Sequence, residues 1–248
     1  MSPTAHSLRT RIKICGLTRE ADVDCAVHAG VDAAGFVLYP KSPRAVSVER
    51  AAELARRLPP FVTPVLLFVN EAPPVVQAAC EQVPGAIAQF HGDESPAQCQ
   101  MSTGDGRVPY LRAARIPMTP TPDGSLDFDL VKFCRQHSSA QAILLDAHVD
   151  GFGGGGKTFP WSLLPANVDS HLVLSGGLTP ANVTDGLAQV RPRCITLAVD
   201  VSSGVECDAP GGGTLKGIKD ADKIHRFVAA VRAADFQIAQ DHVRIPPA

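Results

Sequence analysis

The strongest constraint on the fold is a strict alternation of short apolar runs with segments of helical pattern. The apolar runs, typical of buried strands, cover residues 11–15, 33–38, 63–69, 86–90, 108–113, 142–146, 172–175 and 195–200. The helical patterns follow them in turn, at residues 19–28, 48–58, 73–80, 96–101, 127–137, 161–164, 180–190 and 220–234. Strands joined through helices pair in parallel, because each helix carries the chain back along the sheet.

Eight such units in a chain of 248 residues predict a closed (β/α)8 barrel, the TIM barrel, rather than an open sheet. No shift in composition divides the chain, so we expect a single α/β barrel domain at residues 11–235. Residues 1–10 are expected to be an N-terminal extension and residues 236–248 a frayed C-terminal tail. The glycine-rich stretch 208–217 is expected to be a mobile loop.

Composition and charge exclude several classes of partner. The net charge is −2 with mixed signs, which provides neither a basic stripe for nucleic acid nor a polybasic patch for membranes. The sequence has no apolar stretch of transmembrane length, and its first residues lack the apolar core of a signal peptide, so we expect a cytoplasmic protein. Seven cysteines without a C-x-x-C pair argue against a disulfide framework and a structural zinc site. We expect no metal.

Two reactive side chains stand at predicted strand ends. Cys15 closes the first apolar run and Asp146 closes the sixth. Because the carboxyl ends of all barrel strands meet on one face, where barrel enzymes keep their active sites, we expect the two groups to share a site. A thiolate can act as a base and a carboxylic acid can protonate a sugar oxygen, so the pair predicts proton-transfer chemistry. The alternative for Cys15 is a small buried apolar residue.

The segments after the seventh and eighth strands are typical of an anion site. Small residues allow backbone N–H groups to approach a phosphate, and hydroxyl groups add donors. We assign phosphate binding to Gly176, Gly177, Asp200, Ser202 and Ser203. The alternative is that these glycines only form tight turns.

Three further segments predict substrate contacts. Arg44 follows two prolines that stiffen its loop, and its guanidinium suits a carboxylate, although a solvated surface arginine is the alternative. Gly154, Gly155 and Lys157 belong to a glycine-rich segment after the sixth strand, which is either a loop over an anionic substrate or a flexible connector. His91 is also placed in the substrate site, where we favour a supporting role over proton transfer.

Taken together, these segments resemble the phosphoribosylanthranilate isomerase family of tryptophan biosynthesis. The resemblance runs in order from about residue 11 to 231 and rests on KICG at 13–16, GFV at 35–37, YPKSPR at 39–44, FVN at 68–70, QFHG at 89–92, LLD at 144–146, residues 153–161, LSGGL at 174–178 and residues 198–206. Residues 191–200 and 208–217 depart from the family pattern by being longer.

The resemblance implies an Amadori rearrangement of N-(5-phosphoribosyl)anthranilate to 1-(2-carboxyphenylamino)-1-deoxyribulose 5-phosphate, without metal or organic cofactor. It makes Asp146 the general acid and Cys15 the general base, and it places the anthranilate carboxylate on Arg44. Lys13 is expected to lower the pKa of Cys15. The partner is a small phosphoribosyl molecule, and the choice between monomer and homodimer stays open.

Two rival functions fit parts of the sequence. The related sugar isomerase of histidine biosynthesis uses the same chemistry, but its catalytic pair is two aspartates, so Cys15 argues against it. A phosphate-binding barrel without catalysis would be expected to have lost Cys15 or Asp146, and both are present.

Overall fold

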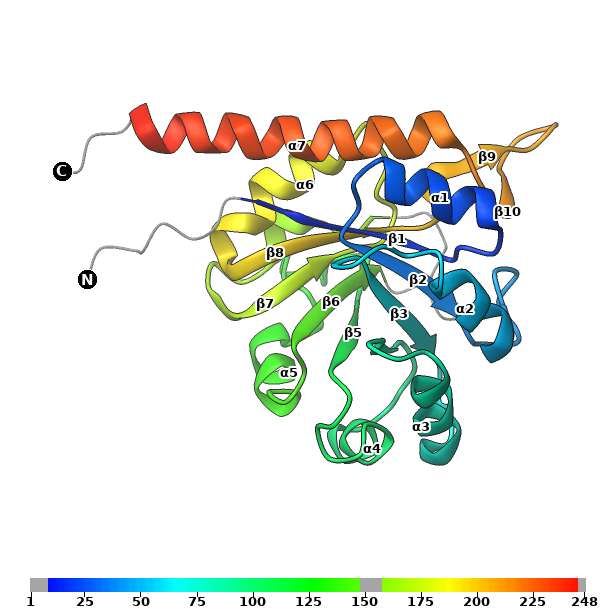
Figure 1. Ribbon diagram of the computed structural model, residues 1–248. Coiled ribbons are helices and arrows are strands. Elements are labelled where there is room, and N and C mark those ends of the chain that lie inside the picture. The colour runs from blue at the N-terminus through cyan, green and yellow to red at the C-terminus, as the bar shows by residue number, and fades with distance from the viewer. Residues whose placement is uncertain (1–8, 148–157, 245–248) are drawn as a thin grey trace.

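The computed structural model describes residues 9–147 and 158–244, and its centre is a closed barrel of parallel strands (Figure 1). The barrel strands are β1 (Arg11–Cys15), β2 (Ala33–Val37), β3 (Thr63–Phe68), β4 (Ile87–Phe90), β5 (Tyr110–Ile116), β6 (Ala142–Ala147), β7 (Val168–Leu174) and β8 (Cys194–Val201). Each strand pairs in parallel with the next, and β8 pairs with β1 to close the ring. The predicted (β/α)8 barrel is confirmed.

Helices surround the barrel on the outside (Figure 1). They are α1 (Glu20–His28), α2 (Val48–Ala55), α3 (Pro73–Gln82), α4 (Pro96–Ser102), α5 (Leu130–Gln136), α6 (Val183–Val190) and α7 (Ala221–Arg244). Short 3-10 turns occur at η1 (Trp161–Leu163), η2 (Arg191–Arg193) and η3 (Ser203–Val205). Local sequence explains several starts: the Ser47 side chain caps α2, and Ser95 and Gln98 form a reciprocal capping box at α4.

Side chains along each strand alternate between two environments, the core between barrel and helices and the interior of the barrel. Side chains such as Ile12, Ile14 and Phe36 belong to the large core between barrel and helices. Cys15, lying on the other side of β1, belongs instead to a small separate cluster with Val37, Leu67 and Val69. Because successive side chains of a strand point to opposite faces, Lys13 lies on the same inner side as Cys15. The polar groups of β1 therefore face the barrel interior.

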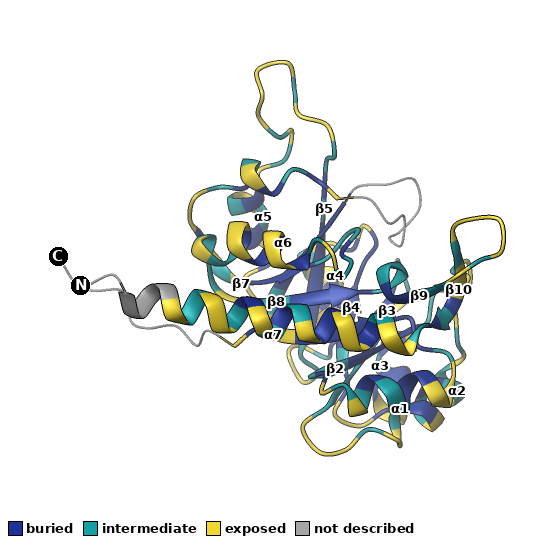
Figure 2. Ribbon diagram, turned by 90° about the horizontal axis from the view of Figure 1, so that it is seen from above, coloured by how far each residue is buried: buried dark blue, intermediate teal, exposed yellow. Residues whose placement is uncertain are grey.

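The C-terminal segment corrects the expectation of a frayed tail. Helix α7 does not end near residue 235 but continues to Arg244. Residues 233–244 contain no glycine or proline, and the first helix-breaking residue is Pro246, so nothing stops the helix earlier. Figure 2 shows α7 lying along the barrel with buried residues on one side and exposed residues on the other.

The stretch 208–217 is also corrected. It forms an antiparallel hairpin of β9 (Glu206–Asp208) and β10 (Thr214–Lys219) rather than a structureless loop. Its turn contains Gly211, Gly212 and Gly213, all at positive φ, which glycine adopts without steric cost. Figure 1 shows the hairpin beyond the carboxyl end of β1. The described residues include no helix that is long and apolar enough to cross a membrane.

A polar network joins α7 to the start of the barrel. The Thr10 N–H donates to Asp235 Oδ2 at 2.7 Å, and the Thr10 hydroxyl donates to Asp235 Oδ1 at 2.5 Å. Arg191 forms an ion pair with the same carboxylate. Arg232 adds a hydrogen bond from Nη1 to the Thr10 carbonyl at 2.7 Å. Asp235 thus connects the last helix to the strand that closes the barrel.

We expect Asp235→Ala to lower the free energy of unfolding by about 2 to 3 kcal/mol, because it removes the acceptor of both Thr10 hydrogen bonds and the ion pair that Arg191 makes with this carboxylate. Urea unfolding followed by circular dichroism measures the loss. Gln237→Ala, at an exposed position of the same helix, is the control and should change it by less than about 0.5 kcal/mol. Equal losses in the two variants would contradict this role of Asp235.

Candidate active site

Cys15 lies at the carboxyl end of β1, on the inner side of the barrel and 5% exposed. The chain turns directly after it at Gly16, whose φ is +72°. A Cβ atom on Gly16 would lie 2.5 Å from Arg44 Cδ and 3.2 Å from Ser202 Oγ. The Ser202 hydroxyl in turn donates to the Cys15 carbonyl at 3.1 Å. The loops after β2 and β8 therefore bring Arg44 and Ser202 to the end of the strand that bears Cys15.

Asp146 lies in β6 and is held on both carboxylate oxygens. Its Oδ1 accepts a hydrogen bond from the Ala147 N–H at 3.0 Å, and its Oδ2 lies 2.9 Å from His91 Nε2. Gly176, after β7, packs against the same group, since a Cβ there would lie 2.8 Å from Asp146 Oδ1. Two further predicted site residues, His91 and Gly176, thus both adjoin Asp146.

His91 is oriented by a neighbour on the same strand exit. The Gln89 amide nitrogen lies 3.2 Å from His91 Nδ1, and both side chains are buried. The two ring nitrogens of His91 thus contact Gln89 and Asp146, and the direction of the hydrogen bond to Asp146 follows from the tautomer of the imidazole. The structure therefore places His91 as a hydrogen-bond partner of the predicted acid.

Asp200, which was predicted to bind phosphate, is paired with a cation in the structure. Its carboxylate accepts a hydrogen bond from Lys13 Nζ at 2.9 Å, with both side chains 5% exposed. The register of β1 against β8 places Lys13 directly opposite Asp200. A buried carboxylate would also repel a phosphate dianion. Asp200 is therefore a partner of Lys13 within the barrel mouth.

Arg44 is buried and not a solvated surface residue. Its Nε donates to Glu206 Oε1 at 2.6 Å and its Nη2 donates to Glu206 Oε2 at 2.9 Å, a bidentate pair. Glu206 also accepts from the Gly217 N–H at 2.8 Å and lies 3.5 Å from Lys219 Nζ. The contacts to Glu206 use one edge of the guanidinium, so its direction is fixed before any ligand arrives.

Sequence reasoning assigned no role to Glu206 or Lys219. Both belong to the hairpin of β9 and β10, which was expected to include a mobile loop, and only the folded hairpin brings Glu206 to Arg44. Lys219 Nζ donates to the Ser202 carbonyl at 2.9 Å. One feature of the sequence could have drawn attention to these two residues: an acidic residue at 206 and a basic residue at 219 flank the glycine-rich stretch.

The loops after β7 and β8 enclose a cavity of about 320 Å³ together with the hairpin. A Cβ on Gly204 would lie 1.9 Å from the Leu178 carbonyl oxygen, so the two loops are in direct contact. The cavity is lined by Gly177, Leu178, Thr179, Ser203, Gly204, Gly213, Thr214, Lys216 and Lys223. Two of the predicted phosphate-binding residues, Gly177 and Ser203, thus line the same cavity. The predicted substrate contacts Gly154, Gly155 and Lys157 lie outside the described residues.

Burial dominates the electrostatics of the site. It raises the pKa of Cys15 above the usual thiol value, an effect that the Lys13 ammonium opposes and Asp200 reinforces. Lys13 therefore acts on the pKa of Cys15 in the expected direction, but burial outweighs it. Burial also disfavours the Lys13 ammonium, but Asp200 and Cys15 together raise its pKa above the usual value. Burial lowers the pKa of Lys219 to about 8.

Glu206 is ionised despite its burial. Burial alone would favour the neutral acid, yet the hydrogen bonds from Arg44 and the charge of Lys219 lower its pKa to about 2. Among the residues that the structure describes, no three His, Cys, Asp or Glu side chains gather as a metal-binding group.

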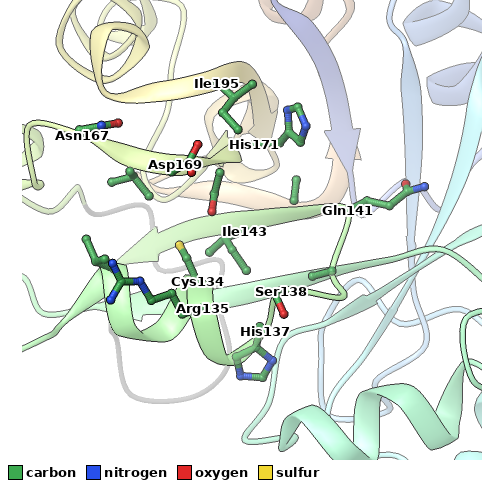
Figure 3. A pocket seen from close by; sticks show the side chains of 15 residues that line it. Cys134, Arg135, His137, Ser138, Gln141, Ile143, Asn167, Asp169, His171 and Ile195 are labelled. Atoms are coloured by element: carbon green, nitrogen blue, oxygen red, sulfur yellow. The ribbon is translucent and has the colours of Figure 1, made fainter.

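A second cavity, of about 410 Å³, lies at the opposite end of the barrel (Figure 3). Residues from the amino ends of β6, β7 and β8 line it, including Ile143, Asp169 and Ile195, together with His137 after α5. Burial lowers the pKa of His137 to about 4. Barrel chemistry is concentrated at the carboxyl ends of the strands, so this cavity is separate from the candidate site.

Comparison with known proteins gives a consistent result. Residues 12–230 match the family model described as N-(5'phosphoribosyl)anthranilate (PRA) isomerase. An N-(5'-phosphoribosyl)anthranilate isomerase from Methylibium petroleiphilum is 63% identical over 236 residues, which is 95% of this chain and 100% of that protein.

Solved structures agree. The phosphoribosyl anthranilate isomerase of Thermotoga maritima matches with a TM-score of 0.74 and 38% identity, covering 90% of this chain and 99% of that one. A phosphoribosyl anthranilate isomerase in complex with reduced 1-(o-carboxyphenylamino)-1-deoxyribulose 5-phosphate matches with a TM-score of 0.71 and 35% identity over the same shares. With the whole barrel matched in sequence and in structure, the chain belongs to the N-(5'-phosphoribosyl)anthranilate isomerase family.

Proposed function

We propose that this protein isomerises N-(5'-phosphoribosyl)anthranilate to 1-(2-carboxyphenylamino)-1-deoxyribulose 5-phosphate, a step of tryptophan biosynthesis. The observation that carries the proposal is the presence of a buried thiol and a buried carboxyl group, Cys15 and Asp146, at two strand exits of one barrel. A relative with the same fold holds the reduced form of this product. The reaction moves protons only, so an acid and a base suffice for it.

In the proposed mechanism Asp146 first acts as the general acid. It protonates the furanose ring oxygen, and the ring opens to a Schiff base. The Cys15 thiolate then takes the proton from C2′, and the electron pair of that C–H bond forms the enolamine, which tautomerises to the ketone. The contacts of Asp146 with His91 and with the backbone of Ala147 fix the acid in place.

The substrate's two anionic ends are assigned to different parts of the site. Arg44, pre-oriented by Glu206, is proposed to hold the anthranilate carboxylate. Gly176, Gly177, Ser202 and Ser203 are proposed to hold the phosphate, at the loops where many barrels bind phosphate.

The glycine-rich segment after β6 keeps its proposed place over the substrate, with Gly154, Gly155 and Lys157 as contacts. Because the mechanism needs a free thiol at Cys15, we also propose that the protein works in the reducing cytoplasm. All seven cysteines are free thiols in the structure.

The first test is turnover of freshly prepared N-(5'-phosphoribosyl)anthranilate without added metal, followed by the loss of its fluorescence. Cys15→Ser and Asp146→Asn should each lower kcat by about 100- to 10,000-fold, because each removes a proton-transferring group. Substrate binding should be retained in both variants.

Matched controls for this test are Cys25→Ser, at a partly buried thiol of α1, and Asp169→Asn, at the opposite end of the barrel. Both should keep near wild-type kcat. An inactive wild-type enzyme would refute the proposed function, whereas an active Cys15→Ser or Asp146→Asn enzyme would refute only the role of that residue.

The phosphate site is tested with Gly177→Ala, where φ is +63°. Gly30→Ala is the matched control, since Gly30 also has positive φ but nothing lies within 4 Å of its added Cβ. Both substitutions carry a backbone cost of about 1 to 2 kcal/mol, so the difference between them isolates the site. Calorimetry should show weaker phosphate binding in Gly177→Ala only, and equal affinities in the two variants would remove this loop from the site.

Arg44→Lys tests the carboxylate contact. An ammonium keeps the charge but loses the planar fork, so affinity for the carboxylate-bearing product should fall by about 1 to 3 kcal/mol. Affinity for inorganic phosphate should stay the same, and Arg135→Lys at the far end of the barrel should change neither. A parallel loss of both affinities in Arg44→Lys would place the guanidinium in the phosphate site instead.

A further inference from the structure

Lys13 is a buried cation whose position is fixed by two neighbouring strands. On one side, its Nζ donates to Asp200 Oδ1 at 2.9 Å, and the two residues are opposite partners in the pairing of β1 with β8. Lys13 and Cys15 are two residues apart on β1, so their side chains lie on the same inner side. Lys13 is only 4% exposed, and a flexible lysine is rarely buried without a partner.

Gly35 creates the space in which this cation meets the thiol. It is the partner of Cys15 in the pairing of β1 with β2. A Cβ on Gly35 would lie 2.9 Å from Lys13 Nζ and 3.0 Å from Cys15 Sγ. The ammonium and the sulfur therefore reach toward the same point above Gly35, and any other residue there would push a carbon atom between or against them.

The charges around Cys15 show how this contact affects the pKa of the thiol. Burial raises the pKa of the thiol, as does the Asp200 carboxylate on β8. The ammonium groups of Lys13 and, more weakly, of Lys219 on β10 act in the opposite direction. Lys219 itself faces Glu206 and Arg44. Lys13 is the cation with the largest effect on Cys15, and it is the one that Gly35 admits.

We propose that Lys13 is a positioning residue for Cys15: Asp200 holds its ammonium above Gly35, where it serves as the counter-ion of the thiolate that removes the C2′ proton. This inference rests on the proposed function. When the sulfur accepts that proton and becomes neutral, the ammonium keeps Asp200 as its partner. The same lysine is therefore paired before and after proton transfer, and no isolated charge is left in the buried site.

The test is the alkylation of Cys15 by iodoacetamide in the free enzyme across a range of pH, quantified on the Cys15 peptide by mass spectrometry. Only the thiolate reacts, so the midpoint of the rate reports its formation. Lys13→Met should raise this midpoint by about one pH unit or more and lower the rate near neutral pH about tenfold. Lys13→Arg should shift it less.

Arg11→Met is the matched control, because it removes one positive charge from the same strand at a side chain that is 60% exposed. Its midpoint should match that of the wild type. In turnover, kcat of Lys13→Met should fall near neutral pH and recover as the pH rises, which a merely structural loss would not do. A folded Lys13→Met protein with an unshifted midpoint overturns the proposal.

Gly35→Ala provides a second test should Lys13→Met fail to fold with Asp200 unpaired. The three atoms nearest to the added methyl group all belong to the side chains of Lys13 and Cys15, so the substitution should displace the ammonium without unfolding the protein. The midpoint should rise in Gly35→Ala, and an unchanged midpoint overturns the proposal. Since alkylation needs no substrate, its outcome is independent of whether the isomerase assay succeeds.

Discussion

The pairing of β8 with β1 is the interaction on which the site depends. It brings together residues that are 187 positions apart in the sequence, Lys13 and Asp200, and places them directly opposite each other. It also sets the loop after β8 beside the loop after β1, so that Ser202 contacts the Cys15 carbonyl. An open sheet with the same strands would leave the first and the last strand on separate edges, and the thiol would have neither neighbour.

Burying charged groups in the barrel mouth costs desolvation free energy, and each of these charges is paired with an opposite one. Lys13 is matched with Asp200, and Glu206 is shared between Arg44 and Lys219. Such pairs add little to stability against apolar replacements, because desolvation consumes most of the attraction. Their value lies in fixed orientation, since a guanidinium and an ammonium that are already held need no rearrangement when an anion binds. The stabilising contacts are elsewhere, in the outer core and in the network around Asp235.

Much of the fold could be predicted from the sequence because its signals are local. Alternating apolar and helical patterns fix the barrel, and strand ends fix which residues share a face. The hairpin of β9 and β10 and the length of α7 were missed, since glycines favour both a loop and a turn, and a solvent-facing helix end carries little apolar pattern.

Within the site, the predicted strand ends indicated that Cys15 and Asp146 lie at the same barrel mouth. They did not indicate which residues pair with each charged group. Asp200 was assigned to phosphate because it precedes a small-residue loop, whereas its direction depends on strand alternation and on the register with β1. The pKa of Cys15 was misjudged for a related reason. The sequence shows that a cation is near, but the opposing effect of burial depends on how tightly the mouth is closed, which only the three-dimensional structure reveals.

The glycines of the site act chiefly through the space they leave. Gly176 allows the loop after β7 to touch the carboxylate of Asp146, and Gly35 allows the Lys13 ammonium and the Cys15 sulfur to approach one point. Gly176 has a positive φ and so also forms a turn, whereas Gly35 lies inside a strand, where glycine has no conformational advantage. A strand glycine that faces the barrel interior is therefore a stronger indication of a functional contact than a glycine in a loop, because the turn does not explain its presence.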